Sequence, residues 1–422
     1  MAKDDIYGNK RRYENLVSNL ELFLKKPKVK KGRGKRKYFI KYKGNLKYFT
    51  KLSVHFDMKD LSYSRRVRVI GVLLFITSVE SKDLKDCVRN DINQIIAAMH
   101  KVNTTVSSKT SFIKNIKCIW RVLFPEKDHL GREDETLCPY VVRHLSRKMD
   151  KSKETLRNEK YTIEEFQQII KFFEKDPKVQ AFITIMQETY ARPQEVLYLK
   201  IRDLQLFDNY GVARVSEHGK EGCKLIQFEN LSYPYLLKWL EQHPLANDLN
   251  TFLFINESNR GRFEQLTNNA INKKLRTACK LLSIDKQITC YTLKRMGITI
   301  DRMNGVPDKI IISKAGWTSA KQLATYDLGT QSEALRMSLI RKGLVKPETL
   351  DEKKFEPKQK ECTFCNNLNS FTDTLCKKCH RPLDRKHMQE MEQSHHKLMN
   401  HELLSRIDKL ESVLQEKLVE MR

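Results

Sequence analysis

The 422-residue sequence predicts a multidomain, mainly α-helical protein. A small helical domain is expected first, then an α+β domain with a small β-sheet, then a cysteine-rich metal-binding segment and a final helix. Three observations predict this order. Apolar residues recur at helical spacing through most of the chain, strand-like alternation is brief and flanks residue 220, and four cysteines lie close together after residue 360. A chain of this length can form two or three domains, each with its own core.

The charge balance favours a polyanionic partner. Lys and Arg number 79 against 52 Asp and Glu, which gives a net charge of +27 and a pI near 9.6. Each neutralised phosphate releases counterions, so this excess favours nucleic acid, although a basic tail would produce the same balance. No apolar run approaches the roughly 20 residues that span a bilayer, and the N-terminus lacks the apolar core of a secretory signal. We therefore expect a cytoplasmic, nucleoid-associated protein with no membrane partner.

Residues 1–45 are expected to form a basic N-terminal arm. Residues 25–37 are nearly continuous Lys and Arg, which repel one another, and Gly32 and Gly34 keep the run flexible. We expect this run to settle on phosphates. A solvated charged linker is the alternative.

Residues 46–126 predict a small helical domain. One helix begins at Asp60-Leu61-Ser62 and continues through Leu73-Leu74, a second covers residues 85–99, and a third begins at Ser107. Its outer surface is expected to be basic, through Arg65, Arg66, Arg68 and Lys114.

Residues 127–159 contain Pro and Gly and a charge-rich run from Lys148 to Lys160, and they are expected to link two domains. Thr162 followed by Glu165 is a capping box that starts a helix. A second domain is therefore expected over residues 160–345.

One stretch of the second domain organises the chain. Tyr291-Thr292-Leu293-Lys294-Arg295 opens a helix that runs to Met303, residues 304–307 form a turn, and a second helix covers residues 308–315. Gly316-Trp317 follows, and then Tyr326. Taken alone, the last two aromatic residues could be a half-buried tyrosine and a core tryptophan.

The order of these residues resembles the second catalytic box of the tyrosine recombinases, the phage integrase family. That box usually reads His-x-x-Arg, a Gly after the helix, Gly-His or Gly-Trp, and a nucleophilic Tyr. Aligning Leu293 with the family leucine places Gly305, Gly316, Trp317 and Tyr326 in family register without a gap.

Residues 187–204 resemble the first box of the same family. Arg192 falls on the catalytic arginine at the start of a helix, and Glu195 falls on the acid that holds this helix end in place. In the family's reaction at a DNA phosphate, this position requires a planar, permanently charged group that contacts two phosphate oxygens.

Two predicted strands, residues 212–216 and 223–228, flank a turn at residues 218–222. This turn resembles the family hairpin whose lysine reaches the scissile base step, and Lys220 is the match. Lys224 is a weaker candidate, and a hairpin lysine taken alone is usually solvated.

Further segments, including residues 233–240, 253–255 and 268–282, look like the archaeal branch of the family. The resemblance therefore runs from about residue 50 to residue 345. It implies a helical core-binding (SAM-like) domain and an α+β catalytic domain that together clamp double-stranded DNA.

The resemblance also implies a reaction, that of a site-specific recombinase or integrase. Tyr326 would attack a backbone phosphate and form a 3′-phosphotyrosyl link with a free 5′-hydroxyl. Arg192, the second-box cation and Trp317 would meet the transition-state charge, and Lys220 would protonate the leaving oxygen. No cofactor is required for catalysis. Recombination implies a monomer in solution that becomes a homotetramer on paired sites.

Two positions depart from the family pattern. The family His is Tyr291, whose phenol, with a pKa near 10, is a poor base but can position a phosphate or aid proton transfer. The family Arg falls on Lys294, which cannot form a bidentate pair, and Arg295 stands one residue further. Register favours Lys294 and chemistry favours Arg295, so both remain candidates. A catalytically degenerate DNA-binding protein and a type IB topoisomerase-like enzyme are the alternative functions.

Residues 346–383 hold two Cys-x-x-Cys pairs, made by Cys362, Cys365, Cys376 and Cys379. Four thiolates at this spacing suit a tetrahedral zinc ion, and a redox pair is the alternative. The segment resembles the zinc ribbon that follows the catalytic domain in archaeal integrase-like recombinases, which implies a structural Zn²⁺. Residues 384–422 predict one long helix, whose apolar residues lie close to heptad spacing.

Overall fold

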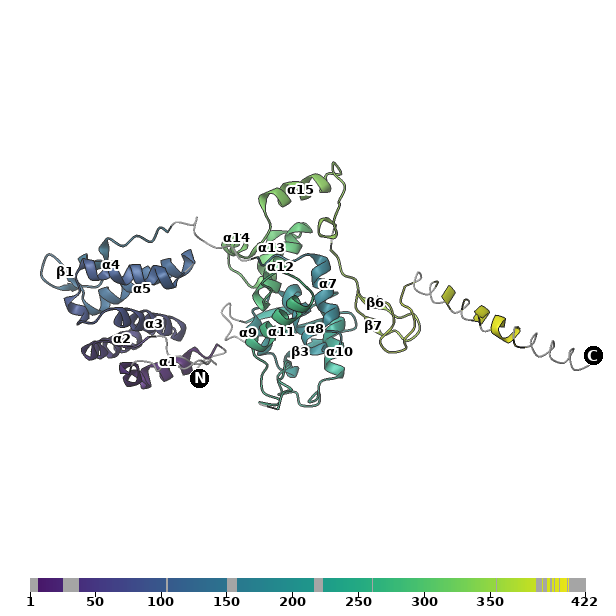
Figure 1. Ribbon diagram of the computed structural model, residues 1–422, viewed down its shortest axis with the longest axis horizontal. Helices are drawn as coiled ribbons and strands as arrows, with labels where there is room; N and C mark the ends of the chain where they lie inside the picture. The colour runs from purple at the N-terminus through teal and green to yellow at the C-terminus, as the bar shows by residue number, and fades with distance from the viewer. Residues whose placement is uncertain are drawn as a thin grey trace, which may run out of the picture. The chain divides into compact units, whose positions relative to one another are not determined.

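The computed structural model describes residues 7–25, 38–103, 105–149, 158–215, 223–259, 261–353 and 355–384, with scattered residues between 389 and 409. The chain divides into two compact units, Met1–Arg157 and Asn158–Arg422, each with its own apolar core. Figure 1 colours the first unit purple to blue and the second teal to yellow. Within the described residues, no helix is both long enough and apolar enough to cross a membrane.

The first unit is a helical bundle. Its main helices are α1 (Asn9–Ser18), α2 (Leu46–Met58), α3 (Tyr63–Val79), α4 (Arg89–Val102) and α5 (Val106–Leu123). Short elements join them: η1 (Leu20–Leu24), η2 (Lys43–Asn45), η3 (Leu84–Asp86), β1 (Glu126–Lys127), β2 (Glu133–Asp134) and α6 (Tyr140–Arg143). Helix α3 packs against α1, α2, α4 and α5 and is buried along most of its second half. It is therefore the centre of this bundle.

Three features of this unit differ from expectation. Residues 127–145, predicted as part of a linker between domains, include β2 and α6, and Val142 and Leu145 are buried in the core of this unit. Within the predicted arm, α1 is a folded helix whose Tyr13 is buried against Phe56 and Tyr63. The expectation that Arg66 lies on the outer surface is wrong. Its side chain is buried, and it bonds to Asp57 and lies 4.9 Å from the Tyr63 ring centroid. The aromatic rings compensate for its burial. Most of the basic run, residues 26–37, lies outside the described residues.

The second unit combines helices with a three-stranded sheet. Its helices are α7 (Ile163–Phe172), α8 (Pro177–Thr189), α9 (Pro193–Leu197), α10 (Tyr233–Glu241), α11 (Asn268–Leu281), α12 (Cys290–Met303), α13 (Asp308–Ala315), α14 (Leu323–Tyr326) and α15 (Gln331–Arg341). Its strands and short helices are η4 (Ile201–Asp203), β3 (Leu204–Leu206), β4 (Gly211–Val215), β5 (Lys224–Phe228), η5 (Ala320–Gln322), η6 (Leu350–Glu352), β6 (Lys360–Glu361) and β7 (Leu368–Asn369). Helix α7 begins at the predicted capping box of Thr162 and Glu165.

Helix α8 is the core of this unit, because every residue from Lys178 to Thr189 is buried. Helices α10 and α12 pack against it. Helix α12 approaches α8 closely at Gly297, where a Cβ atom would lie 1.8 Å from the Gln187 carbonyl oxygen. Glycine is therefore required there. This contact fixes α12 beside the end of α8, where the first-box arginine follows.

Strands β3, β4 and β5 form an antiparallel sheet in that order. In the β4–β5 pair, Val215 lies opposite Lys224 and Ala213 lies opposite Ile226. Ala213, Val215 and Ile226 are buried, so Lys224, two residues from Ile226, also faces inward. The predicted strands are confirmed. The connecting residues 216–222, which include Lys220, lie outside the described residues.

After α15 the chain returns across its own unit. Asn304 exchanges two hydrogen bonds with the Phe355 backbone, at 2.8 and 3.1 Å. Phe355, Leu368 and Phe371 pack against the main core, and the Tyr235 hydroxyl lies 2.7 Å from Thr372 Oγ1. The cysteine-rich segment is thus attached to the second unit. Of the predicted final helix, only scattered residues up to 409 are described, and these are helical.

Candidate active site

Arg192 is placed by the sharp turn that ends α8. Tyr190 adopts a left-handed φ of 53°, and Arg192 then becomes the N-cap residue of α9. The buried carboxylate of Glu195 accepts from the Arg192 backbone N–H at 2.9 Å and lies 3.3 Å from its Nη1. The acid therefore holds both the helix end and the guanidinium.

Lys224 connects this corner to a second segment. Its ammonium lies 3.2 Å from Glu195 Oε2 and donates to the Ala315 carbonyl oxygen at 3.2 Å. Burial lowers the pKa of Lys224, and the Glu195 charge opposes that shift. Glu195 thus lies between two cations, and Lys224 ties it to the end of α13, directly before Gly316-Trp317.

Helix α12 carries the second-box residues. Lys294 is fully buried, with its Nζ 5.0 Å from the Tyr326 ring centroid and 5.6 Å from the Trp317 ring centroid. Tyr291, one turn earlier, is half-exposed. Burial raises the pKa of Tyr291, and the nearby Arg192 charge opposes the shift. Tyr291 therefore stays protonated at neutral pH.

Trp317 follows the left-handed Gly316, whose φ is 72°. Its ring packs in a small cluster with Ile298 and Leu323, 5.0 Å from the Tyr326 ring. Among the described residues, the buried Nε1 of Trp317 has no hydrogen-bond partner. A buried donor of this kind can donate to a ligand.

Arg295 points elsewhere. Its Nη1 donates to Glu159 Oε2 at 2.6 Å, and its Nη2 donates to the Thr325 carbonyl oxygen at 3.3 Å. The two adjacent cations are thus separated: Lys294 faces Tyr326 and Trp317, whereas Arg295 joins a carboxylate to the backbone beside the tyrosine.

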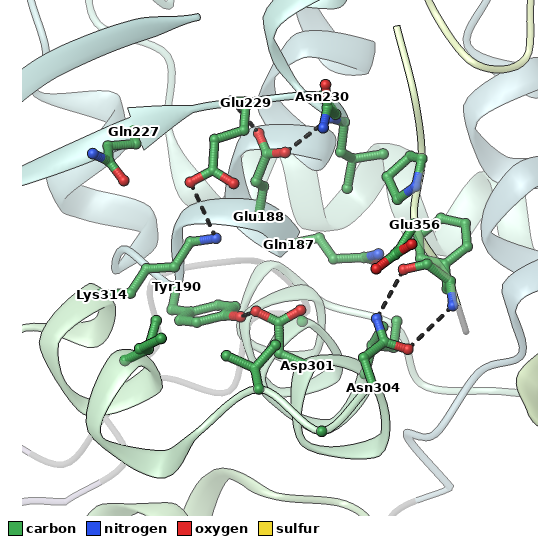
Figure 2. Close-up of a pocket in the computed structure, with 18 of the residues that line it drawn as sticks. Gln187, Glu188, Tyr190, Gln227, Glu229, Asn230, Asp301, Asn304, Lys314 and Glu356 are labelled. Carbon is green, nitrogen blue, oxygen red and sulfur yellow. Dashed lines mark hydrogen bonds and ion pairs between the residues drawn. The ribbon is translucent and has the colours of Figure 1, made fainter. Parts of the chain in front are cut away.

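A polar hollow of about 870 Å³ lies beside this cluster (Figure 2). Two pairs of its polar groups contact each other: the Tyr190 hydroxyl donates to Asp301, and Lys314 lies 3.6 Å from Glu229. None of the predicted catalytic residues that the structure describes lines it. The chemistry expected from the sequence is therefore located outside this hollow.

Comparison with known proteins identifies the domain. Residues 160–331 match the model of the phage integrase family. This segment is a phage integrase domain. No curated protein sequence matches the chain.

Solved structures share the fold of this chain over about two thirds of its length. XerH recombinase bound to a palindromic difH substrate has a TM-score of 0.52 at 15% identity, covering 67% of this chain and 82% of that one. A lambda integrase dimer bound to a COC′ core site has a TM-score of 0.51 at 14% identity, covering 66% and 76%. The Tn1549 transposon integrase in complex with transposon right end DNA has a TM-score of 0.52 at 11% identity, covering 70% and 98%. At these identities the likeness concerns the fold.

The integrase domain thus gathers Arg192, Tyr291, Lys294, Trp317 and Tyr326, five of the seven predicted catalytic residues. Arg295 lies on the neighbouring face of α12, and Lys220 falls outside the described residues. Glu159, which binds Arg295 beside this cluster, was not predicted to be part of the site. No sequence signal would have found it, because it pairs with a residue 136 positions away.

The four cysteines form a compact cluster behind the integrase domain. Their Sγ atoms all lie within 4.8 Å of one another, and two pairs, Cys362 with Cys379 and Cys365 with Cys376, are 3.5 Å apart. Tetrahedral Zn–S bonds of about 2.3 Å place sulfur atoms about 3.8 Å apart. The thiols therefore fit a zinc ion.

The turns around the cysteines repeat one geometry. Asn366 and His380 each follow the second cysteine of a pair, and both have a left-handed φ, of 53° and 57°. Each donates its backbone N–H at 2.9 Å to the carbonyl oxygen of the first cysteine. Burial opposes it, but backbone N–H groups of Cys379 and Lys378 lower the pKa of Cys376. A thiolate is the form that binds zinc.

Proposed function

We propose that this protein is a site-specific DNA recombinase or integrase that cuts and rejoins DNA through a 3′-phosphotyrosyl intermediate on Tyr326. The observation that carries the proposal is the position of Tyr326 within an integrase domain, against the buried ammonium of Lys294 and the buried N–H of Trp317, which lacks a partner among the described residues. Duplex DNA is the substrate. This substrate is consistent with the net charge of +27.

The reaction is an in-line displacement at phosphorus. The Tyr326 oxygen forms a bond to the scissile phosphorus while the bond to the 5′-oxygen breaks, and the tyrosine proton is lost as the leaving oxygen gains one. Arg192, Lys294 and Trp317 stabilise the charge on the non-bridging oxygens. Tyr291 positions a phosphate oxygen through its hydroxyl, since a phenol with a raised pKa is a poor base.

We assign the second-box cation to Lys294. Its ammonium lies beside the nucleophile, whereas the guanidinium of Arg295 is engaged by Glu159 and the Thr325 carbonyl. We assign to Lys220 the role of proton donor: its side chain would protonate the leaving 5′-oxygen. The bonds of Lys224 to Glu195 and to Ala315 favour a structural role for that lysine.

We further propose that the active form is a homotetramer assembled on paired sites from monomers. Recombination needs four active sites in one synapse, and α15 directly follows the nucleophile. Leu335 and Leu339 of this helix are 62% and 42% exposed to solvent. Leu344, just after the helix, is 69% exposed. An apolar surface of this kind supports docking onto a neighbouring protomer.

We assign the cysteine segment as a zinc ribbon of the archaeal integrase type. Zinc held by Cys362, Cys365, Cys376 and Cys379 would have all four positions taken by protein, which suits a structural ion and leaves no open position for catalysis. A bound ion would hold the two turns against each other through these four thiolates. The ribbon then presents Phe371 and Thr372 to the integrase domain.

The deciding experiment traps the covalent complex on nicked duplexes and sequences the junctions. The Tyr326→Phe variant removes only the hydroxyl, so it should retain DNA affinity and lose the adduct. An adduct on another tyrosine would overturn the assignment. Absence of any adduct from the wild-type protein would favour a DNA-binding protein of the same fold, and relaxation without strand exchange would favour a topoisomerase-like activity.

A further inference from the structure

Three residues on one face of α12 contact the segment that carries the nucleophile. Arg295, Thr299 and Arg302 are spaced at i, i+4 and i+7, so they form a stripe along the helix. Arg295 donates to the Thr325 carbonyl oxygen at 3.3 Å. Thr299 Oγ1 accepts from the Leu328 backbone N–H at 2.8 Å, and Arg302 pairs with Asp327. The contacted residues, 325, 327 and 328, enclose Tyr326.

The stripe is itself fixed in place. Arg295 is held by Glu159 at 2.6 Å, and the hydroxyl of the fully buried Thr299 donates to the Arg295 carbonyl oxygen at 3.0 Å. Arg302 also lies 3.3 Å from Asp308. The positions of these donors and acceptors are therefore set by α12 and its neighbours rather than by the nucleophile segment.

The nucleophile segment needs such support. Tyr326 is the last residue of α14, a four-residue helix in which only Leu323 is buried. A helix of one turn is unstable by itself, because nucleation costs more than a single turn returns. Contacts with the rest of the fold must therefore hold Tyr326.

We propose that Arg295, Thr299 and Arg302 form a clamp, a set of positioning residues that holds residues 325–328 on α12. The clamp keeps the Tyr326 ring against Lys294, which projects from the adjacent face of the same helix. This proposal rests on the proposed function, because it assigns the clamp to the cleavage step. It explains why an arginine follows Lys294 without contacting the phosphate.

The test uses Thr299→Val, which removes the hydroxyl and preserves the shape of the side chain. The amide of Leu328 loses its acceptor, so we expect its hydrogen exchange to accelerate roughly tenfold, and the single-turnover rate of adduct formation to fall by a similar factor. DNA affinity should stay within about twofold of the wild-type value. Thr277→Val is the matched control, because the Thr277 hydroxyl donates to the Lys273 carbonyl oxygen of its own helix, far along the chain from the nucleophile segment.

A second arm separates positioning of the tyrosine from stabilisation of charge. In a Tyr326→Phe background, hydrogen peroxide serves as an external nucleophile: its oxygen bonds to phosphorus and the 5′-oxygen leaves. Thr299→Val should not slow this cleavage, whereas Lys294→Ala should slow it about 100-fold. Equal losses in both backgrounds would overturn the clamp, as would an unchanged adduct rate in Thr299→Val.

The two proposals fail in different ways. If the wild-type protein forms no adduct, the proposed function fails. The clamp is then overturned as a catalytic device even if the Leu328 amide is protected. If the wild-type protein forms the adduct and the Leu328 amide exchanges equally fast with and without the Thr299 hydroxyl, only the clamp fails. Should Thr299→Val lower the melting temperature, Arg302→Gln provides the same comparison from the opposite end of the stripe.

Discussion

The ammonium of Lys294 lies 5.0 Å from the centre of the Tyr326 ring, whereas Arg295, one residue further along α12, donates to Glu159. Successive helix residues point about 100° apart, so only one of two adjacent cations can face the nucleophile. The packing of α12 against α8 at Gly297 sets the rotation of the helix, and Lys294 is therefore the cation that faces Tyr326.

This relationship predicts unequal effects at the two cations. Lys294→Ala should lower the single-turnover cleavage rate about 100-fold, because one donor to the transition-state charge is lost. Arg295→Gln should lower it only about tenfold, through a less well held tyrosine. Quench-flow measurement of adduct formation on a nicked duplex gives both rates.

A methylphosphonate substrate supplies the control. It carries a methyl group in place of one non-bridging oxygen and therefore lacks one negative charge. Cleavage by Lys294→Ala should recover in part on this substrate, and cleavage by Arg295→Gln should not. Recovery in Arg295→Gln alone would place Arg295, and not Lys294, at the phosphate.

Gly297→Ala should destabilise the second unit. The new Cβ would lie 1.8 Å from the Gln187 carbonyl oxygen, so α8 and α12 must separate, at a cost of at least about 2 kcal/mol. The matched control is Gly71→Ala in α3, where no heavy atom outside the adjoining backbone of its own helix lies within 4 Å of the new Cβ. There the higher helix propensity of alanine should stabilise by up to about 1 kcal/mol. Denaturant unfolding would measure both, and a neutral Gly297→Ala would contradict the close packing.

Asp83 should make the free energy of unfolding of the first unit depend on pH in the acidic range. Burial opposes it, but hydrogen bonds from Lys47 and Tyr48 lower the pKa of Asp83 to about 2 from a usual value of 3.8. Because the folded pKa is depressed, the stabilisation is complete above about pH 4 and is lost as the pH falls towards 2. Asp83→Asn should remove this part of the pH dependence.

The measurement needs a signal from the first unit alone. Of the three tryptophans, Trp120 is buried in that unit, so its emission reports unfolding when Trp239 and Trp317 are replaced by phenylalanine. Denaturation curves between pH 2 and pH 6 would then be compared in this background for the chain that retains Asp83 and for its Asp83→Asn variant. Identical slopes of stability against pH with and without the carboxyl group would contradict the prediction.

Zinc removal should release the ribbon from the integrase domain. Native mass spectrometry should find one zinc ion per chain, and Cys376→Ser should lose it, because three thiolates bind zinc far less tightly than four. Hydrogen exchange should then increase in α10, whose Tyr235 is hydrogen-bonded to Thr372. Cys118→Ser in α5 is the control and should change neither result. Full zinc occupancy in Cys376→Ser would remove that cysteine from the ligand set.

Local patterns in the sequence predicted what depends on local physics. The capping box at Thr162, the strands on either side of residue 220 and the helices of the second box all lie where expected, because caps, alternation and glycine turns act over a few residues. The register of Gly316, Trp317 and Tyr326 likewise needed only the spacing along the chain.

What the sequence did not predict depends on distant partners. The direction of Arg295 is set by Glu159, and the burial of Arg66 by aromatic rings from α1 and α3. Helix α1 was hidden by the charge around it, because it buries only Tyr13. The attachment of the cysteine segment to α10 likewise joins residues 137 positions apart, a relationship that no short motif encodes.

That attachment has a consequence for synthesis of the protein on the ribosome. The partner of Tyr235 is made 137 residues later, and at roughly 5 to 20 residues per second this delay is roughly 7 to 27 s. Until then, the Tyr235 hydroxyl of α10 and the part of the core that Phe371 packs against stay uncovered in the nascent chain. We expect chaperones that bind apolar surfaces to associate with ribosomes stalled before Cys376 and to dissociate once the ribbon has emerged and bound its metal.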